Sequence, residues 1–166
     1  DGLVTGVQTC ALPICHKQIV FVEGGEKNVA STLRRNGITK ALGLYKDKVD
    51  EAIFLEGDYS FNSGYKAGNL IAEMITKPTA VFCYNDDMAI GLHKYFVQNQ
   101  LDGIGIMGFD GSIMTEYMTP GITTVKRPIK LIAEKAIELL LSSIESEEEE
   151  EMIFVYDQVI IERDSI

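Results

Sequence analysis

Short apolar runs alternate with longer, helix-like segments from Lys17 onward, and this alternation constrains the fold more than any other feature of the chain. The runs are the expected strands, at residues 19–22, 52–55, 80–84, 104–109, 123–126 and 154–161. Strands separated by helices form βαβ units around a parallel sheet. The early runs are almost continuously apolar, which is typical of strands buried on both faces. The sequence therefore predicts an α/β fold, with an open, mostly parallel sheet flanked by helices.

The segments between these runs have the composition and spacing of helices. Helices are expected over residues 28–42, 63–76, 88–98 and 129–144. In the first of them, Val29, Leu33 and Ala41 are the expected inward-facing residues. Ser60 is expected to cap the second, because a serine hydroxyl accepts hydrogen bonds from first-turn amides. The last segment is rich in Ala, Leu and Glu, which favour helix intrinsically.

Charge and cysteine content exclude several classes of function for this segment. Its formal net charge is −10, from 25 acidic and 15 basic residues, whereas a surface that binds nucleic acid is basic. No apolar run is long enough to cross a membrane, so no membrane partner is expected. The three cysteines, Cys10, Cys15 and Cys83, have neither CxxC nor metal-site spacing. Neither a disulfide nor a metal site is predicted, and Cys83 is interpreted as a small core residue.

The first fourteen residues differ in character from the rest. They read DGLVTGVQTCALPI, with no charged start, no continuous apolar stretch and no helical or strand period, so they make a poor secretory signal. Residues 4–14 resemble a translated sequencing adapter. Residues 1–14 are therefore expected to be a foreign tail, with Cys15 as the junction codon, and residues 15–166 to be the domain.

Ligands of an open parallel sheet bind beyond the carboxyl ends of its strands. The residues that follow the apolar runs are therefore the candidates for a binding site. They lie at positions 23–26, 56–61, 85–87, 110–112 and 127.

Four side chains have chemistry suited to a polyhydroxylated ligand. Tyr59 offers a ring that stacks on the apolar face of a sugar or base. Asn85 presents both a donor and an acceptor, and Asp110 accepts from two hydroxyls. The Arg34 guanidinium forks onto ligand oxygens or onto Asp110 itself. The alternatives are core packing for Tyr59, helix capping for Asn85 and a surface charge for Arg34.

Two other motifs point to different chemistry. Residues 103–108 match GxGxxG, but the motif lies inside an expected strand, whereas a dinucleotide site needs it between a strand and a helix. Asp86, Asp87 and Asp110 suggest a metal or phospho-acceptor cluster. The simpler interpretation is that Asp86 or Asp87 caps the following helix and that Asp110 binds ligand hydroxyls. No base–nucleophile pair is visible, so neither an enzyme nor a cofactor is predicted.

Several stretches, in order, resemble the effector-binding domain of LacI/GalR transcriptional regulators. The resemblance covers nearly all of residues 15–166 and is carried by HKQI at 16–19, GDYSFNSGYKA at 57–67, KPTAVFCYNDDMAIG at 77–91, MGFDGS at 107–112, TPGITTVKRP at 119–128 and VIIERDS at 159–165. It implies one lobe of a type I periplasmic-binding-protein-like fold. The segment 101–105 is shorter than the family's usual link.

The resemblance also implies which residues bind the ligand. Arg34 resembles the family's arginine for ligand oxygens, and Tyr59 resembles its stacking aromatic. Asn85 matches its amide contact, and Asp110, of Gly-Phe-Asp, matches its hydroxyl-binding acid. Arg127 falls where the family often has Gln or Arg beside the pocket.

The implied function is that of the effector-sensing part of a bacterial regulator, which binds a sugar-like small molecule between two lobes in the cytoplasm. In the family a DNA-binding head and a first lobe precede position 16, so this chain is expected to be a fragment that reaches DNA only through the missing part. The helix at 129–144 is expected to pack in the absent lobe, and the regulator to form a homodimer. The alternative is a periplasmic sugar-binding protein of a transporter or chemoreceptor. The stretches 123–128 and 159–165 favour the regulator.

Overall fold

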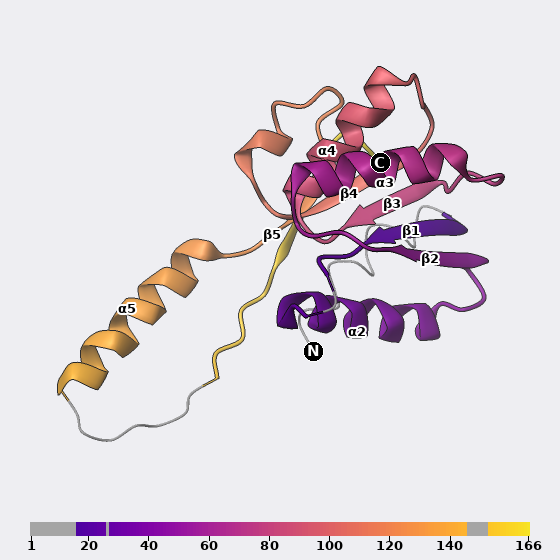
Figure 1. Ribbon diagram of the computed structural model, residues 1–166. Helices are drawn as coiled ribbons and strands as arrows, with labels where there is room; N and C mark the ends of the chain where they lie inside the picture. The colour runs from indigo at the N-terminus through magenta and orange to yellow at the C-terminus, as the bar shows by residue number, and fades with distance from the viewer. Residues whose placement is uncertain (1–15, 26, 146–152) are drawn as a thin grey trace.

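The computed structural model of the chain describes residues 16–25, 27–145 and 153–166. A six-stranded sheet runs through it in the order β2-β1-β3-β4-β5-β6 (Figure 1). The strands are β1 (Gln18–Val22), β2 (Glu51–Leu55), β3 (Ala80–Cys83), β4 (Gly105–Asp110), β5 (Thr123–Lys126) and β6 (Val159–Ile161). All neighbouring pairs are parallel except β5 and β6, which are antiparallel. The predicted open, mostly parallel sheet is confirmed.

The centre of the sheet is the core of the protein. All four residues of β3 and four of the five in β1 are buried, as their continuous apolar sequences predict. The Phe21 ring on β1 stacks on Phe54 of β2 at 5.0 Å between ring centroids and meets Phe82 of β3 edge to face at 6.3 Å. The strand predicted at 154–161 is shorter than expected, because only Val159–Ile161 pairs with β5. Residues 153–158 lie outside the sheet and run beside the helix at residues 129–145.

Helices cover both faces of the sheet. Figure 1 shows α3 (Phe61–Glu73) and α4 (Asp86–Gln98) over one face and α2 (Val29–Leu44) beneath the other. A short 3-10 turn, Ile113–Thr115, follows β4. Ser60 caps α3 as predicted, since its hydroxyl accepts from the Ser63 amide at 3.1 Å.

The expected inward face of α2 is partly wrong. Ala41 is buried, but Val29 and Leu33 are 74% and 53% exposed. Ser31 and Ile38 are buried instead. Val29 and Leu33 lie two residues either side of Ser31, about 200° around the helix. They face outward because the inward side of α2 carries Arg34 toward the ends of the strands.

Glycines allow α3 and α4 to pack closely. A Cβ on Gly64 would lie 2.0 Å from the Met88 carbonyl oxygen, and one on Gly91 would lie 2.0 Å from the Phe61 carbonyl oxygen. Tyr65 and Tyr95 meet edge to face between the same helices at 5.0 Å. The N-terminal halves of α3 and α4 are therefore in close backbone-to-backbone contact.

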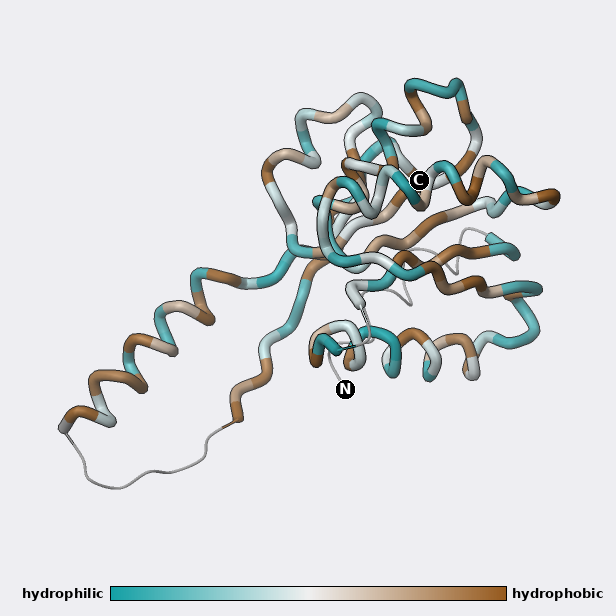
Figure 2. The backbone as a smooth tube through the Cα atoms, viewed as in Figure 1, coloured by the Kyte–Doolittle hydropathy of each residue, from teal (hydrophilic) through white to brown (hydrophobic). Residues whose placement is uncertain are grey.

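The helix α5 (Ile129–Glu145) projects away from the sheet (Figure 1). Residues 153–158 return alongside it, and Lys135 Nζ lies 4.7 Å from the centre of the Phe154 ring. Much of the apolar surface of α5 is uncovered, with Ile137, Leu141 and Ile144 each more than half exposed. Figure 2 shows this apolar stripe as brown segments along the helix. Within the described ranges, no helix is both long and apolar enough to span a membrane.

Replacing Gly91 by Ala is expected to destabilise the fold by roughly 1–3 kcal/mol, because the new methyl group would meet backbone that cannot rotate away. Gly43→Ala is the matched control, since a Cβ there meets nothing within 4 Å. Gly43 lies in the last turn of α2, where alanine should stabilise by up to about 1 kcal/mol. Urea denaturation measures both variants. Equal effects at the two positions would contradict the close helix contact.

Candidate functional site

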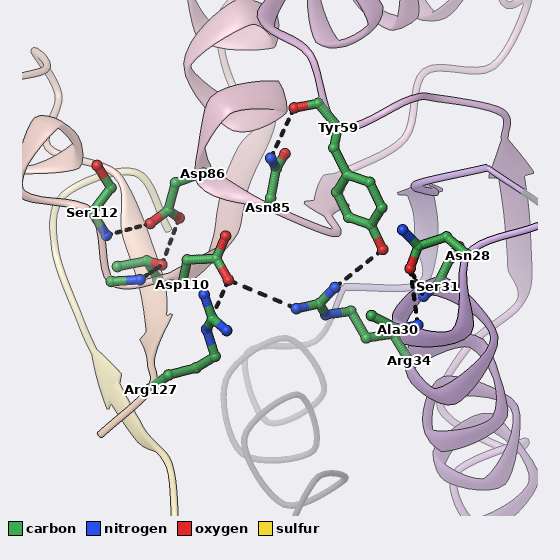
Figure 3. Close-up of polar contacts among 12 residues, drawn as sticks. Asn28, Ala30, Ser31, Arg34, Tyr59, Asn85, Asp86, Asp110, Ser112 and Arg127 are labelled. Atoms are coloured by element: carbon green, nitrogen blue, oxygen red, sulfur yellow. Dashed lines mark hydrogen bonds and ion pairs between the residues drawn. The ribbon is translucent and has the colours of Figure 1, made fainter. Parts of the chain in front are cut away.

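Polar side chains from five parts of the chain meet beyond the carboxyl ends of the parallel strands (Figure 3). All five predicted ligand-binding residues lie in this group, joined by direct contacts in one continuous series. In order the series is Arg127, Asp110, Arg34, Tyr59 and Asn85. They come from the ends of β5 and β4, from α2, from the loop after β2 and from the end of β3. The sheet's parallel register brings together residues up to 93 positions apart (34 to 127).

Asp110 is the central residue of the series. Arg127 Nε lies 3.0 Å from its Oδ1, and an Arg34 terminal nitrogen lies 3.7 Å from the same oxygen. Its side chain is 30% exposed, so a ligand can reach the carboxylate. Burial raises the pKa of Asp110 above its usual value, while the two guanidiniums oppose that rise and the nearby Asp87 adds to it. A partly buried acceptor flanked by cations is suited to hydroxyl donors.

Arg34 links the two sides of the site. Its guanidinium donates to the Tyr59 hydroxyl at 3.1 Å and lies 4.1 Å from the centre of the Phe109 ring. The side chain is 16% exposed. Its buried Nε has no hydrogen-bond partner within the described residues. Arg34 is therefore not the surface charge that the sequence left open as an alternative. One of its N–H donors is not used by the described part of the protein.

Tyr59 is held by an unusual local backbone. Its φ is +67°, and the preceding Asp58 accepts from the Ser60 amide at 2.9 Å. Hydrogen bonds from Ser60 and Ser63 lower the pKa of Asp58 to about 2, so this carboxylate keeps its charge further into the acid range than an ordinary aspartate. The Tyr59 ring lies over Gly24, where a Cβ would be 1.9 Å from the ring. Only glycine at position 24 lets the ring take this place.

Asn85 uses both ends of its amide within the protein. Its Nδ2 donates to the Tyr59 carbonyl oxygen at 2.9 Å, and its Oδ1 accepts from the Met88 amide at 3.0 Å. Asn85 therefore caps α4, and the expectation that Asp86 or Asp87 does so is wrong. Asp86 fails as a cap because it is already the first helical residue, and its carboxylate points toward β5. A ligand contact by Asn85 remains a prediction.

Sequence reasoning missed a second polar group next to the first. Arg35 pairs with Glu23 and lies 4.0 Å from the centre of the Phe54 ring, and Tyr84 donates to the other Glu23 oxygen at 3.2 Å. The hollow beside them has a volume of about 460 Å³ and is lined by Glu23, Gly25, Ser31, Thr32, Arg35, Phe54 and Glu56. None of the five predicted residues lines it. Glu23, Gly25 and Glu56 fall within the candidate segments 23–26 and 56–61, but the sequence did not group them with Arg35, whose only signal was its position next to Arg34.

The GxGxxG motif and Cys83 take the places that the sequence predicts. Gly105 and Gly108 of GxGxxG lie within β4, and a short 3-10 turn rather than a helix follows that strand. Cys83 is buried and free, and burial raises its thiol pKa well above the usual range. Across the described part of the chain, no three His, Cys, Asp or Glu side chains gather closely enough to hold a metal ion. The proposed foreign tail and Cys15 lie outside the described residues.

Comparison with known proteins identifies the family. The model of the periplasmic binding protein-like domain matches residues 15–166. The HTH-type transcriptional repressor PurR of Vibrio atlanticus is 32% identical over 154 residues, which cover 91% of this chain. The chain belongs to the periplasmic-binding-protein-like family, in the form found in LacI-type regulators.

Two further relatives are also transcriptional regulators by name. The HTH-type transcriptional regulator MalR of Clostridium butyricum is 37% identical over 135 residues, which are 80% of this chain and 40% of that protein. A LacI family regulator from Enterococcus faecium, solved with bound ribose, has a TM-score of 0.80 at 27% identity and covers 99% of this chain and 61% of its own. The match covers 46% of the PurR relative, so this chain spans about half the length of that protein.

Replacing Arg127 by Gln is expected to raise the pKa of Asp110 further, because the variant removes the larger of the two cationic influences on that carboxylate. Arg34→Gln should raise it less. Arg35→Gln is the control, since Arg35 pairs with Glu23 instead. Carboxyl ¹³C shifts followed by NMR across the acid range measure all three. A pKa that falls in Arg127→Gln, or an equal shift in Arg35→Gln, would contradict the assigned contacts.

Proposed function

We propose that this chain is the effector-sensing C-terminal lobe of a bacterial transcriptional regulator and that its ligand is a sugar or related polyhydroxylated metabolite. The observation that carries the proposal is the Arg34–Asp110 pair at the open edge of the sheet. It sets the carboxylate acceptor at the end of β4 3.7 Å from a guanidinium donor on α2.

The chemistry of the pair suits adjacent ligand oxygens. A carboxylate accepts from two hydroxyls, and a guanidinium donates to ring or hydroxyl oxygens in a fixed geometry. The Tyr59 ring next to Arg34 adds an apolar surface on which a sugar ring stacks. The ribose bound by the Enterococcus faecium relative supports this class of ligand.

The proposed regulator contains a second lobe that closes over this edge. The uncovered apolar stripe of α5 supports that arrangement, because burying it against a first lobe would remove exposed side chains such as Leu140 and Ile144 from water. The ligand favours the closed arrangement of the lobes only to the extent that it binds that arrangement more tightly than the open one. Closure would then alter a cytoplasmic homodimer whose DNA contacts come from an upstream segment.

The relatives favour the regulator over a periplasmic binding protein. The relatives named above are a repressor and regulators. The negative charge of this segment is consistent with a sensing lobe that leaves DNA contacts to another part of the protein.

The decisive test uses the full-length protein, whose gene is recovered from the source locus upstream of the His16 codon. A DNA-binding segment and a first lobe are expected there, and the protein should bind its own promoter in a gel-shift assay. Ribose and a panel of other monosaccharides serve as probes of the response. A signal peptide with no DNA-binding segment would overturn the proposal.

Asp110→Asn is expected to weaken the sugar response of that full-length protein by about tenfold or more while promoter binding stays intact, since a charged hydrogen bond contributes roughly 1.5–3 kcal/mol. Asp102→Asn is the control, since it also removes one negative charge and Asp102 is exposed before the start of β4, at the other end of the strand from Asp110. Titration calorimetry gives the affinities. An unchanged response in Asp110→Asn would exclude this carboxylate as a ligand contact.

The 166-residue chain alone is expected to self-associate through α5 and to bind ribose weakly, because it holds only one wall of the site. Introducing Glu at Ile137 and Leu141, which are 59% and 57% exposed one turn apart, should shift the chain to monomer in sedimentation velocity. Ser142→Glu adds charge on another side of the helix and should leave association unchanged. A wild-type chain that stays monomeric would contradict the expectation.

A further inference from the structure

Asp86 has a buried carboxylate that neither helix capping nor the proposed ligand contacts use. The residue is 1% exposed and begins α4, directly after β3. Its neighbour Asn85 makes the capping contact with the Met88 amide. A buried carboxylate is costly unless hydrogen-bonded, so its partners indicate what it does.

The carboxylate reaches across β4 to two separate segments. Oδ1 accepts from the Thr124 hydroxyl on β5 at 2.6 Å, and Oδ2 accepts from the Ser112 amide at 2.6 Å (Figure 3). Thr124 Oγ1 in turn accepts from the Gly111 amide at 3.3 Å. The Asp86 carboxylate and the Thr124 hydroxyl thus hold two consecutive amides, those of Gly111 and Ser112, in the turn after β4.

Gly108 lets the carboxylate take this path. It lies on β4 directly opposite Thr124 in the sheet, and a Cβ there would be 2.2 Å from Asp86 Oδ1. The carboxylate therefore rests against the bare backbone of the strand that it crosses. Any larger residue at 108 would push it away from Thr124.

The turn that Asp86 holds is strained. Asp110 has φ +124° and Gly111 has φ +78°. A non-glycine residue in such a conformation costs about 1–3 kcal/mol and persists only where surrounding contacts impose it. The amides of Gly111 and Ser112, which follow Asp110 directly, are the ones bound by Thr124 and Asp86.

We propose that Asp86, acting through Thr124 and the Ser112 amide, is a positioning residue that holds the Asp110–Ser112 turn and so sets where the Asp110 carboxylate is presented. The effect of this positioning on ligand selection rests on the proposed function of Asp110 as a ligand contact. The positioning itself is a property of the protein without ligand. Asp86 thereby connects β3, β4 and β5 at the edge where the site forms.

Thr124→Val tests the proposal, because it removes the hydroxyl between Asp86 and Gly111 while nearly keeping the side-chain shape. In the 166-residue chain, amide exchange at Gly111 is expected to accelerate about fivefold, because its hydrogen bond to the Thr124 hydroxyl is lost. Exchange at Ser112 should also accelerate, because the Asp86 carboxylate that binds its amide loses the Thr124 contact that holds it in place. Amides within β1 and β3 should keep their protection. The pKa of Asp110 should move toward its usual value, since release of the turn reduces the burial that raises it.

Two variants separate positioning from general destabilisation. Thr124→Ser keeps the hydroxyl and should restore both readouts. Thr123→Val removes a buried hydroxyl on the same strand that bonds instead to the backbone of Arg163. It should lower stability without changing exchange at Gly111 or the pKa of Asp110.

The proposal is overturned if Thr124→Val leaves both readouts unchanged or if Thr123→Val alters them equally. It is also overturned if Thr124→Ser fails to restore them. Because no ligand enters these measurements, a failure of sugars to bind the full-length protein would count against the proposed function alone.

Discussion

The parallel pairing of β1, β3, β4 and β5 is the constraint on which the site depends. It brings the carboxyl ends of these strands to one edge, so residues far apart in sequence become neighbours without any local interaction between them. Asp110 and Arg127 are adjacent because β4 and β5 pair in register, with Asp110 opposite Lys126. Burial of the apolar strands β1 and β3 stabilises the register of the sheet. Polar side chains therefore collect where the core ends.

Each polar group at this edge is partly satisfied by another. Arg34 bonds to Tyr59 and faces Asp110, and Asn85 is occupied at both ends of its amide. Such mutual pairing limits the cost of burying charge when no ligand is bound. It also means that an incoming polyol would exchange one set of hydrogen bonds for another. Affinity would then depend on how well the ligand's oxygens match the existing geometry.

The lobe has two unlike surfaces. One is the sheet with its covering helices, where α3 and α4 approach at glycines and leave little room for change. The other is α5, most of whose apolar stripe is uncovered within the described residues. This difference agrees with a chain that spans about half of its LacI-type relatives. The stable sheet supports the site, while α5 needs another surface.

The sequence by itself determined the parallel α/β sheet, the approximate strand positions and the edge where the candidate residues meet, because apolar periodicity and chain order depend on local patterns. Only the tertiary structure decided how those residues are used. Val29 and Leu33 face outward because α2 turns its arginines toward the site, and β6 is short because residues 153–158 follow α5. Asp86 contacts Thr124 and Ser112 rather than capping its helix. Pairings of this kind join residues 26 and 38 positions apart, and no local pattern encodes them.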